Sequence, residues 1–159
     1  MVVQGHGTRG RQIWGPLSVG AAAQVHVIRV RRYRCIRCRA VVTVTPAEVL
    51  HKRMYGAAAI GLALALFGLL LLSAWQARQQ VSPWQVVGAT SSGRWVTLRR
   101  WCEAAVEGRL WQSVHGRVAE GPVRQVAGRC ASVLAGYALP SLKPLPLVVQ
   151  VFHGAARAQ

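Results

Sequence analysis

The sequence predicts an α+β protein, in which a small two- or three-stranded cysteine-knuckle β-ribbon precedes a mainly helical part. Three observations support this fold class. Apolar and charged residues alternate from Gln24 onward, which is typical of a strand with one charged face. Cys35 and Cys38 form a CxxC pair directly ahead of a second, β-branched run. Beyond residue 50, apolar residues recur at helical spacing.

The N-terminal third divides into two parts. Residues 1–23 are rich in glycine and arginine, and we expect a loop or a short basic arm there. Residues 24–50 are expected to form a zinc-ribbon-like β-hairpin with the CxxC pair between its strands. Pro46 should end the second strand, because proline cannot donate to a strand ladder.

Residues 55–75 form an apolar run of 21 residues without a charge. That length permits a membrane-spanning helix, and the positive charge before it would keep the N-terminus in the cytoplasm. A helix covered on every face by neighbouring helices would show the same composition. The many alanines and glycines of the run, and the arginines on both sides of it, argue for the buried helix, but the residues alone leave the two interpretations nearly even. It is the family resemblance described below that favours the buried helix. A single-pass protein of the inner membrane remains the alternative.

Residues 51–110 are expected to form a helical, helix-turn-helix-like domain. In it a helix should begin after Ser91 or Ser92 and run to about Glu107, where Gly108 ends it. Residues 111–159 should hold an amphipathic helix over about 122–137 and a proline-rich tail without a predicted element. Cys102 and Cys130 lie on apolar helical faces and are expected to be buried core thiols.

Charge indicates the class of partner. Twenty Lys and Arg face four Glu and no Asp, which gives a net charge of +16, and eighteen of the twenty cations are Arg. Such a chain suits a polyanion, and arginine is the residue that binds phosphate and guanine with two parallel hydrogen bonds. A GC-rich genome explains an excess of Arg over Lys, but it does not explain the missing acids. Glu103 and Glu107 could share one helix face, but that pair alone is too little for the carboxylate cluster of a two-metal active site, so we expect no enzyme.

Several segments in this order resemble a bacterial family found with insertion sequences and transposase-like genes. They are HGTRGRQIWGP, RRYRCIRCRAVVTVTP, HKRMYGAAAIGLALAL, VSPWQVVGA and RWVTLRRW, and the resemblance extends from about Gly5 to Tyr137. It implies an N-terminal zinc ribbon joined to a helix-turn-helix domain, and an association with transposases. Family members carry an earlier CxxC that completes four zinc ligands, whereas only four residues precede Gly5 here. Either the start lies upstream, or the ribbon is degenerate and binds no metal; a decayed reading frame is a third explanation.

The resulting hypothesis is a cytoplasmic, non-catalytic DNA-binding protein whose protein partners would be a transposase or a second copy of itself. Zinc is the candidate cofactor, with Cys35 and Cys38 as ligands and His6, His26 or His51 as completing ones. Phosphate contacts are assigned to the ribbon arginines, and base contacts to the helix that starts near Ser92, although a merely solvated amphipathic helix would look the same. The candidate DNA-binding residues are Arg29, Arg31, Arg32, Arg34, Arg37, Arg39, Arg94, Thr97, Arg99 and Arg100.

Overall fold

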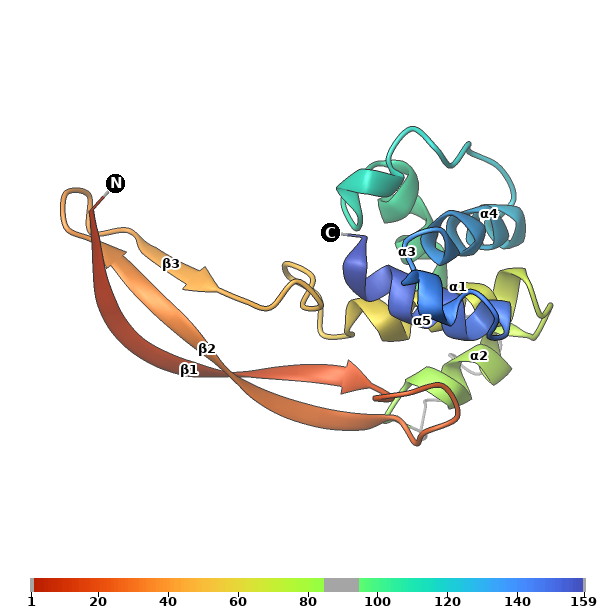
Figure 1. The fold of residues 1–159 in the computed structure, drawn as a ribbon, viewed down its shortest axis with the longest axis horizontal. Helices are drawn as coiled ribbons and strands as arrows, with labels where there is room; N and C mark the ends of the chain where they lie inside the picture. The colour runs from red at the N-terminus through yellow and green to blue at the C-terminus, as the bar shows by residue number, and fades with distance from the viewer. Residues whose placement is uncertain (1, 85–94, 159) are drawn as a thin grey trace.

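The structure is a computed structural model, and it describes residues 2–84 and 95–158 (Figure 1). Within these ranges the fold is α+β, as expected, with a three-stranded antiparallel sheet in the order β1-β2-β3 and five α-helices. The strands are β1 (Val3–Gly15), β2 (Gln24–Cys35) and β3 (Val41–Val44). The helices are α1 (Ala57–Gly68), α2 (Ala74–Val81), α3 (Val96–Val106), α4 (Val123–Ala135) and α5 (Leu147–Arg157), with short 3-10 turns η2 (Gln112–Val114) and η3 (Pro140–Leu142).

The strands and their turns, residues 3–44, form a long ribbon that projects from the helical body (Figure 1). β1 pairs with β2 from Val3 opposite Cys35 to Gly15 opposite Gln24, with a shift of register between Gly5 and Thr8. The expectation of a loop or arm over residues 1–23 is therefore wrong for most of that segment. Its glycines and arginines have little strand preference of their own, and the pairing edge of β2 supplies the hydrogen bonds that hold it extended.

The strands expected around the cysteine pair are confirmed. β3 pairs with the end of β2, from Val41 opposite Arg34 to Val44 opposite Arg31. Cys35 closes the turn between them, because its N–H donates to the carbonyl of Ala40 (2.8 Å) and its carbonyl accepts from the N–H of Arg39 (3.0 Å). All four residues of β3 are exposed, so this strand is an open edge of the sheet.

The apolar run over residues 55–75 does not form one helix. α1 ends at Gly68, and α2 begins after Ser73, whose hydroxyl accepts from the N–H of Gln76 while the Gln76 side chain accepts from the N–H of Ser73. α1 is buried on almost every face and packs against α4 and α5. Within the described ranges, no helix combines the length and the apolar character that crossing a bilayer requires.

The C-terminal half supplies the rest of the helical body. α4 lies close to the expected residues 122–137, whereas the tail, for which no element was predicted, contains α5. The core joins these helices: Trp111 is fully buried and its Nε1 donates to the carbonyl of Ala155 on α5 (2.9 Å). This body is where the apolar surface is buried, and the ribbon extends outside it (Figure 1).

Candidate nucleic-acid interface

The ribbon concentrates positive charge without any carboxylate. The chain has eight arginines between residues 2 and 47, and its first acidic residue is Glu48. Among the described residues, the two ion pairs are Arg99–Glu103 and Arg109–Glu107, and both belong to the helical body. The ribbon arginines in the described part of the chain are therefore not neutralised by acidic neighbours. They are Arg9, Arg11, Arg29, Arg31, Arg32, Arg34, Arg37 and Arg39.

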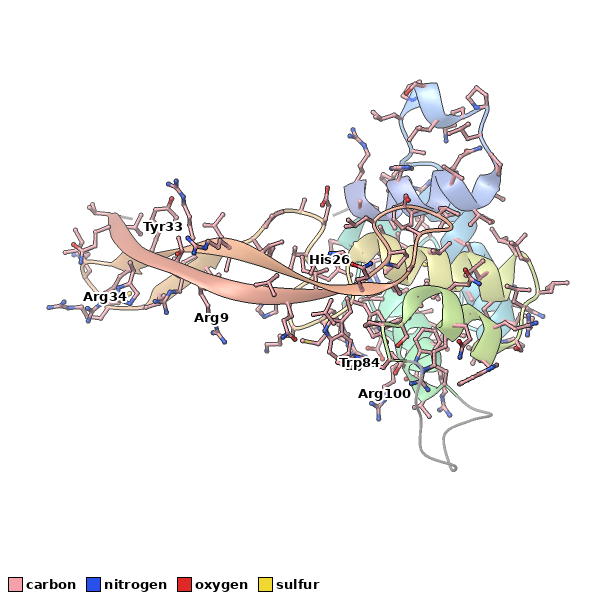
Figure 2. The ribbon with its side chains drawn as sticks, turned by 90° about the horizontal axis from the view of Figure 1, so that it is seen from below. Arg9, His26, Tyr33, Arg34, Trp84 and Arg100 are labelled. Carbon is pink, nitrogen blue, oxygen red and sulfur yellow. The ribbon has the colours of Figure 1, made fainter. Side chains whose placement is uncertain are left out.

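These arginines divide between the two faces of the ribbon, since successive side chains of a strand point in opposite directions. Arg29 and Arg31 share a face with Tyr33, which we call the open face. Arg32 and Arg34 point to the other side, which we call the cleft face. Arg9 and Arg11 join them there, because they pair with Val30 and Ile28 of β2. Tyr33 and the pair Arg9 and Arg34 lie on opposite sides of the ribbon in Figure 2.

Not every ribbon arginine is available to a ligand. Arg11 is part of the scaffold: its Nη2 donates to the carbonyls of Leu50 (2.8 Å) and Arg53 (3.2 Å). Arg32 is half-buried, and its Nε has no hydrogen-bond partner among the described residues. Arg9, Arg29, Arg31, Arg37 and Arg39 are exposed. The freely accessible charge therefore lies along both faces and at the tip turn.

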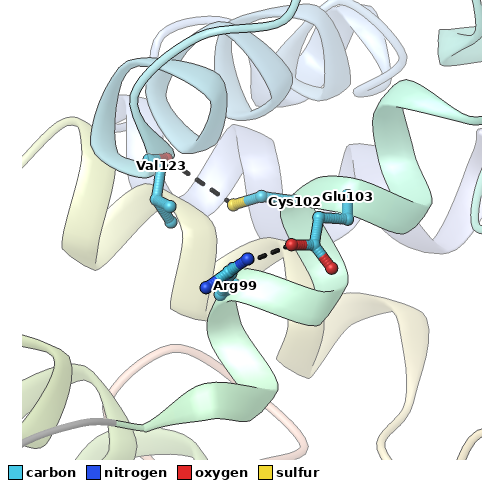
Figure 3. Close-up of polar contacts among 4 residues, drawn as sticks. All are labelled: Arg99, Cys102, Glu103 and Val123. Carbon is cyan, nitrogen blue, oxygen red and sulfur yellow. Dashed lines mark hydrogen bonds and ion pairs between the residues drawn. The ribbon is translucent and has the colours of Figure 1, made fainter.

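The expected recognition helix offers less free charge than the ribbon. Arg99 and Arg100 are exposed on α3, but the Nε of Arg99 donates to Glu103 at 2.8 Å (Figure 3). Thr97 is half-buried, while Arg94 and Ser92 lie outside the described residues. Between α2 and α3 the structure describes only residues 82–84 and 95, so a helix-turn-helix arrangement is not confirmed.

The tip turn brings Cys35 and Cys38 together. Cys35 is 6% exposed and Cys38 is exposed. Hydrogen bonding from the backbone of Cys38, then from its side chain and the backbone of Arg37, lowers the pKa of Cys35, because these donors stabilise the thiolate. Within residues 2–84 and 95–158, however, no group of three or more His, Cys, Asp or Glu could hold a metal ion. His26 bonds instead to the carbonyl of Gly15 at the base of the ribbon (3.1 Å).

The other two cysteines are buried core thiols, as expected. Cys102 on α3 donates to the carbonyl of Val123 (3.6 Å; Figure 3), and Cys130 on α4 is fully buried. Burial raises the pKa of both thiols to about 12, so both stay protonated at neutral pH.

Sequence reasoning missed two accessible cations on the ribbon and its return loop, Arg9 and Lys52. Arg9 lies in β1, where no strand was expected, and its side chain faces the loop that carries Lys52. The absence of acids continues back from residues 24–47 through residues 2–23, and it was the available signal for Arg9.

Comparison of the chain with protein-family models, with curated proteins and with solved structures finds no match.

Proposed function

We propose that this protein binds DNA without catalysing a reaction, and that the ribbon supplies most of its affinity. The observation that carries the proposal is the set of arginines on an acid-free ribbon that projects from the body. A strand ribbon is also a shape that the major groove of B-DNA admits. Each phosphate contact releases condensed counterions, so a set of unpaired, exposed arginines on one projecting element suits this ligand.

The helix α3 has a secondary part in this proposal. It would act as the recognition helix of a helix-turn-helix. Arg100 would be its accessible cation, and Arg99 would become available to DNA only when its ion pair with Glu103 breaks. An exposed pair of this kind is worth roughly 0.3–0.5 kcal/mol, so a phosphate can displace Glu103 at little cost. We therefore assign affinity to the ribbon and leave to α3 any contribution to sequence preference.

Zinc fits the tip only in part. Cys35 and Cys38 would supply two thiolates, and structural zinc takes four ligands. The residues that the structure describes do not complete that set, so we route no part of DNA binding through a metal. On the basis of the resemblance, we propose an association with transposases, with a transposase or a second copy of this chain as the protein partner. We propose that the protein acts in the cytoplasm because its ligand is DNA.

The test compares the ribbon tip with α3 at equal change of charge. We would measure the affinity for a DNA duplex over a range of salt concentrations, using the wild type, Arg37→Gln/Arg39→Gln and Arg99→Gln/Arg100→Gln. If both tip residues contact phosphates, the slope of log K against log salt should fall by roughly 1.8 in the tip variant, at roughly 0.9 per contact. The α3 variant should lose less, because Arg99 is already paired.

Two results would contradict the proposal. One is a wild-type protein that binds no duplex at low salt, or binds it without salt dependence. The other is a tip variant whose affinity and salt slope equal those of the wild type, while the α3 variant loses both. That second result would indicate that α3, and not the ribbon tip, contacts the DNA.

A further inference from the structure

A cleft lies at the fork where β3 leaves the ribbon. β3 ends at Val44, and residues 45–54 return the chain to the helical body while β1 and β2 continue beside them (Figure 1). The cleft between these walls has a volume of about 1050 Å³ and is open on one side. It lies against the cleft face of the ribbon, because Arg9, Arg11 and Val30 line one wall and residues 51–54 line the other.

The two walls are fixed to each other by hydrogen bonds. Arg11 of β1 reaches across to the carbonyls of Leu50 and Arg53. At the base, the N–H of Trp14 donates to the carbonyl of Met54 (2.8 Å), and the N–H of Gly56 donates to the carbonyl of Trp14 (3.1 Å). The cleft is thus formed before any ligand arrives, which reduces the ordering that binding requires.

The lining combines a cationic rim with an apolar floor. Arg9 and Lys52 are exposed on opposite walls, and Arg53 is half-buried between them. Met54 and Val41 are exposed and contribute apolar surface, whereas Val30 is 2% exposed and offers little. None of the lining residues is acidic. A recessed site of this kind strengthens the attraction of an anion, because less water lies between the charges than on an open surface.

These features favour a chain-like anion with an apolar part. Small-molecule sites occupy about 300–1,000 Å³, so this cleft is at the upper end and exceeds what a single phosphate fills. In a single strand the unpaired bases can lie on the apolar floor while the phosphates face the rim. In a duplex the bases are stacked inside, and the floor would stay empty. A second copy would bring the same positive charge to the rim.

We infer that the fork cleft binds the sugar–phosphate backbone of one single-stranded segment of nucleic acid, held between Arg9 of β1 and Lys52 of the return loop. The inference rests on the proposed function and names a site within it. A positively charged groove that follows the backbone is the usual way in which proteins hold single strands. No second wall lies opposite the arginines of the open face, so they contribute less to the affinity for a single strand.

The test uses a matched pair of variants on the same ribbon. Binding of a fluorescent oligo-dT would be measured by anisotropy over a range of salt concentrations. Arg9→Ala/Lys52→Ala removes two charges from the cleft, and Arg29→Ala/Arg31→Ala removes two from the open face. The cleft variant should lose roughly 1.4 from the salt slope, at roughly 0.7 per single-strand contact, and roughly tenfold or more in affinity at 0.1 M salt. The open-face variant should lose several-fold less.

A third variant tests the cleft without removing a cation. Thr43 lines the cleft from β3 and is exposed, so Thr43→Glu should repel a phosphate backbone in the cleft while its new side chain needs no buried space. We expect it to weaken oligo-dT binding and to leave duplex binding closer to that of the wild type. Circular dichroism melting would confirm that each variant folds.

The outcomes separate this inference from the proposed function. If the wild type binds neither duplex nor oligo-dT, both fail. If it binds DNA with normal salt dependence, but the open-face variant loses as much as the cleft variant and Thr43→Glu loses nothing, the DNA-binding function stands and the cleft is excluded as its single-strand site.

Discussion

At the scale of single residues, the surroundings of each cysteine decide its chemistry. Cys35 sits in a turn whose donors lower its pKa, whereas Cys102 and Cys130 lie between helices where burial raises the pKa to about 12. The same side chain therefore has a lower pKa at the ribbon tip than in the core. Sequence periodicity alone was sufficient to place the two core thiols, because they fall on apolar helical faces.

The raised thiol pKa values predict a loss of stability in alkali. In the unfolded chain these thiols ionise near their usual pKa of 9.0, while in the folded protein they stay protonated to about pH 12. The unfolded state therefore binds fewer protons across this window, and the free energy of unfolding should fall as the pH rises from 9 to 12. The slope should be about 1.4 kcal/mol per pH unit for each thiol.

Urea unfolding at a series of pH values would measure this slope. The variant Cys102→Ala/Cys130→Ala is the control, since it keeps the tyrosines and the tip cysteines. Its stability should be lower at neutral pH, because two buried groups are truncated, but it should decline less steeply above pH 9. Equal slopes in the two proteins would show that the core thiols do not cause the alkaline loss.

At the scale of elements, the apolar run divides because its middle adopts a left-handed turn. Leu71 has a φ of +57°, a backbone conformation that residues other than glycine rarely adopt. The N–H groups of Leu70 and Leu72 bond back to Ala65 and Leu66 at the end of α1. Arg124 of α4 then donates to the carbonyls of Phe67 (2.6 Å) and Leu72 (3.2 Å) and lies over the Phe67 ring. A cation at a helix C-terminus is favourable, so α4 stabilises this end of α1.

The strained turn predicts a stabilising substitution. Leu71 is 68% exposed, so Leu71→Gly loses little buried surface and removes the steric cost of the positive φ. We expect the free energy of unfolding to rise by roughly 0.5–1 kcal/mol, or at least not to fall. Leu70→Gly is the matched control: Leu70 is exposed and has no positive φ, and its replacement should destabilise. Thermal melts of both variants would decide, and a loss in Leu71→Gly equal to that in the control would contradict the strain argument.

At the scale of the whole molecule, the buried core and the densest positive charge lie in different places. The buried core joins the helices, while the ribbon has exposed valines on its edge strand, such as Val44 at 53% exposure. Positive charge is denser on the ribbon, because residues 2–47 contain eight arginines and no acid, whereas the longer remainder of the chain contains twelve cations and four glutamates. A DNA-binding element that protrudes from a stable body can enter a groove or enclose a strand without disturbing the core.

This division predicts a graded pattern of hydrogen exchange. Amides of α1 should exchange only through global unfolding, since the helix is buried and packs against two others. Amides of β3 should exchange fastest among the strands, because all its residues are exposed and one edge is open. Hydrogen-exchange mass spectrometry at neutral pH would measure both segments in one experiment. Protection of β3 equal to that of α1 would indicate that the ribbon and the body unfold as one unit.

Much of the fold could be predicted from the sequence because the signals are local. The alternation of apolar and charged residues predicted β2, and the β-branched run after the CxxC pair predicted β3. Helical periodicity predicted α4 and most of α3. The same local signals failed where pairing or packing decides the structure. β1 has a loop-like composition, and α5 lies in a proline-rich tail whose helix is buried against α1 and α4.

The sequence by itself determined the charge, the absence of acids from residues 2–47, the α+β class and the burial of the core thiols. Those properties depend on composition and on periodicity, which need no partner. Only the tertiary structure decided that Arg9 and Lys52 face each other across a cleft, that Arg11 is a scaffold residue and that residues 55–75 divide into separate elements. Each of these depends on contacts between residues far apart in the chain, and local preference carries no information about such contacts.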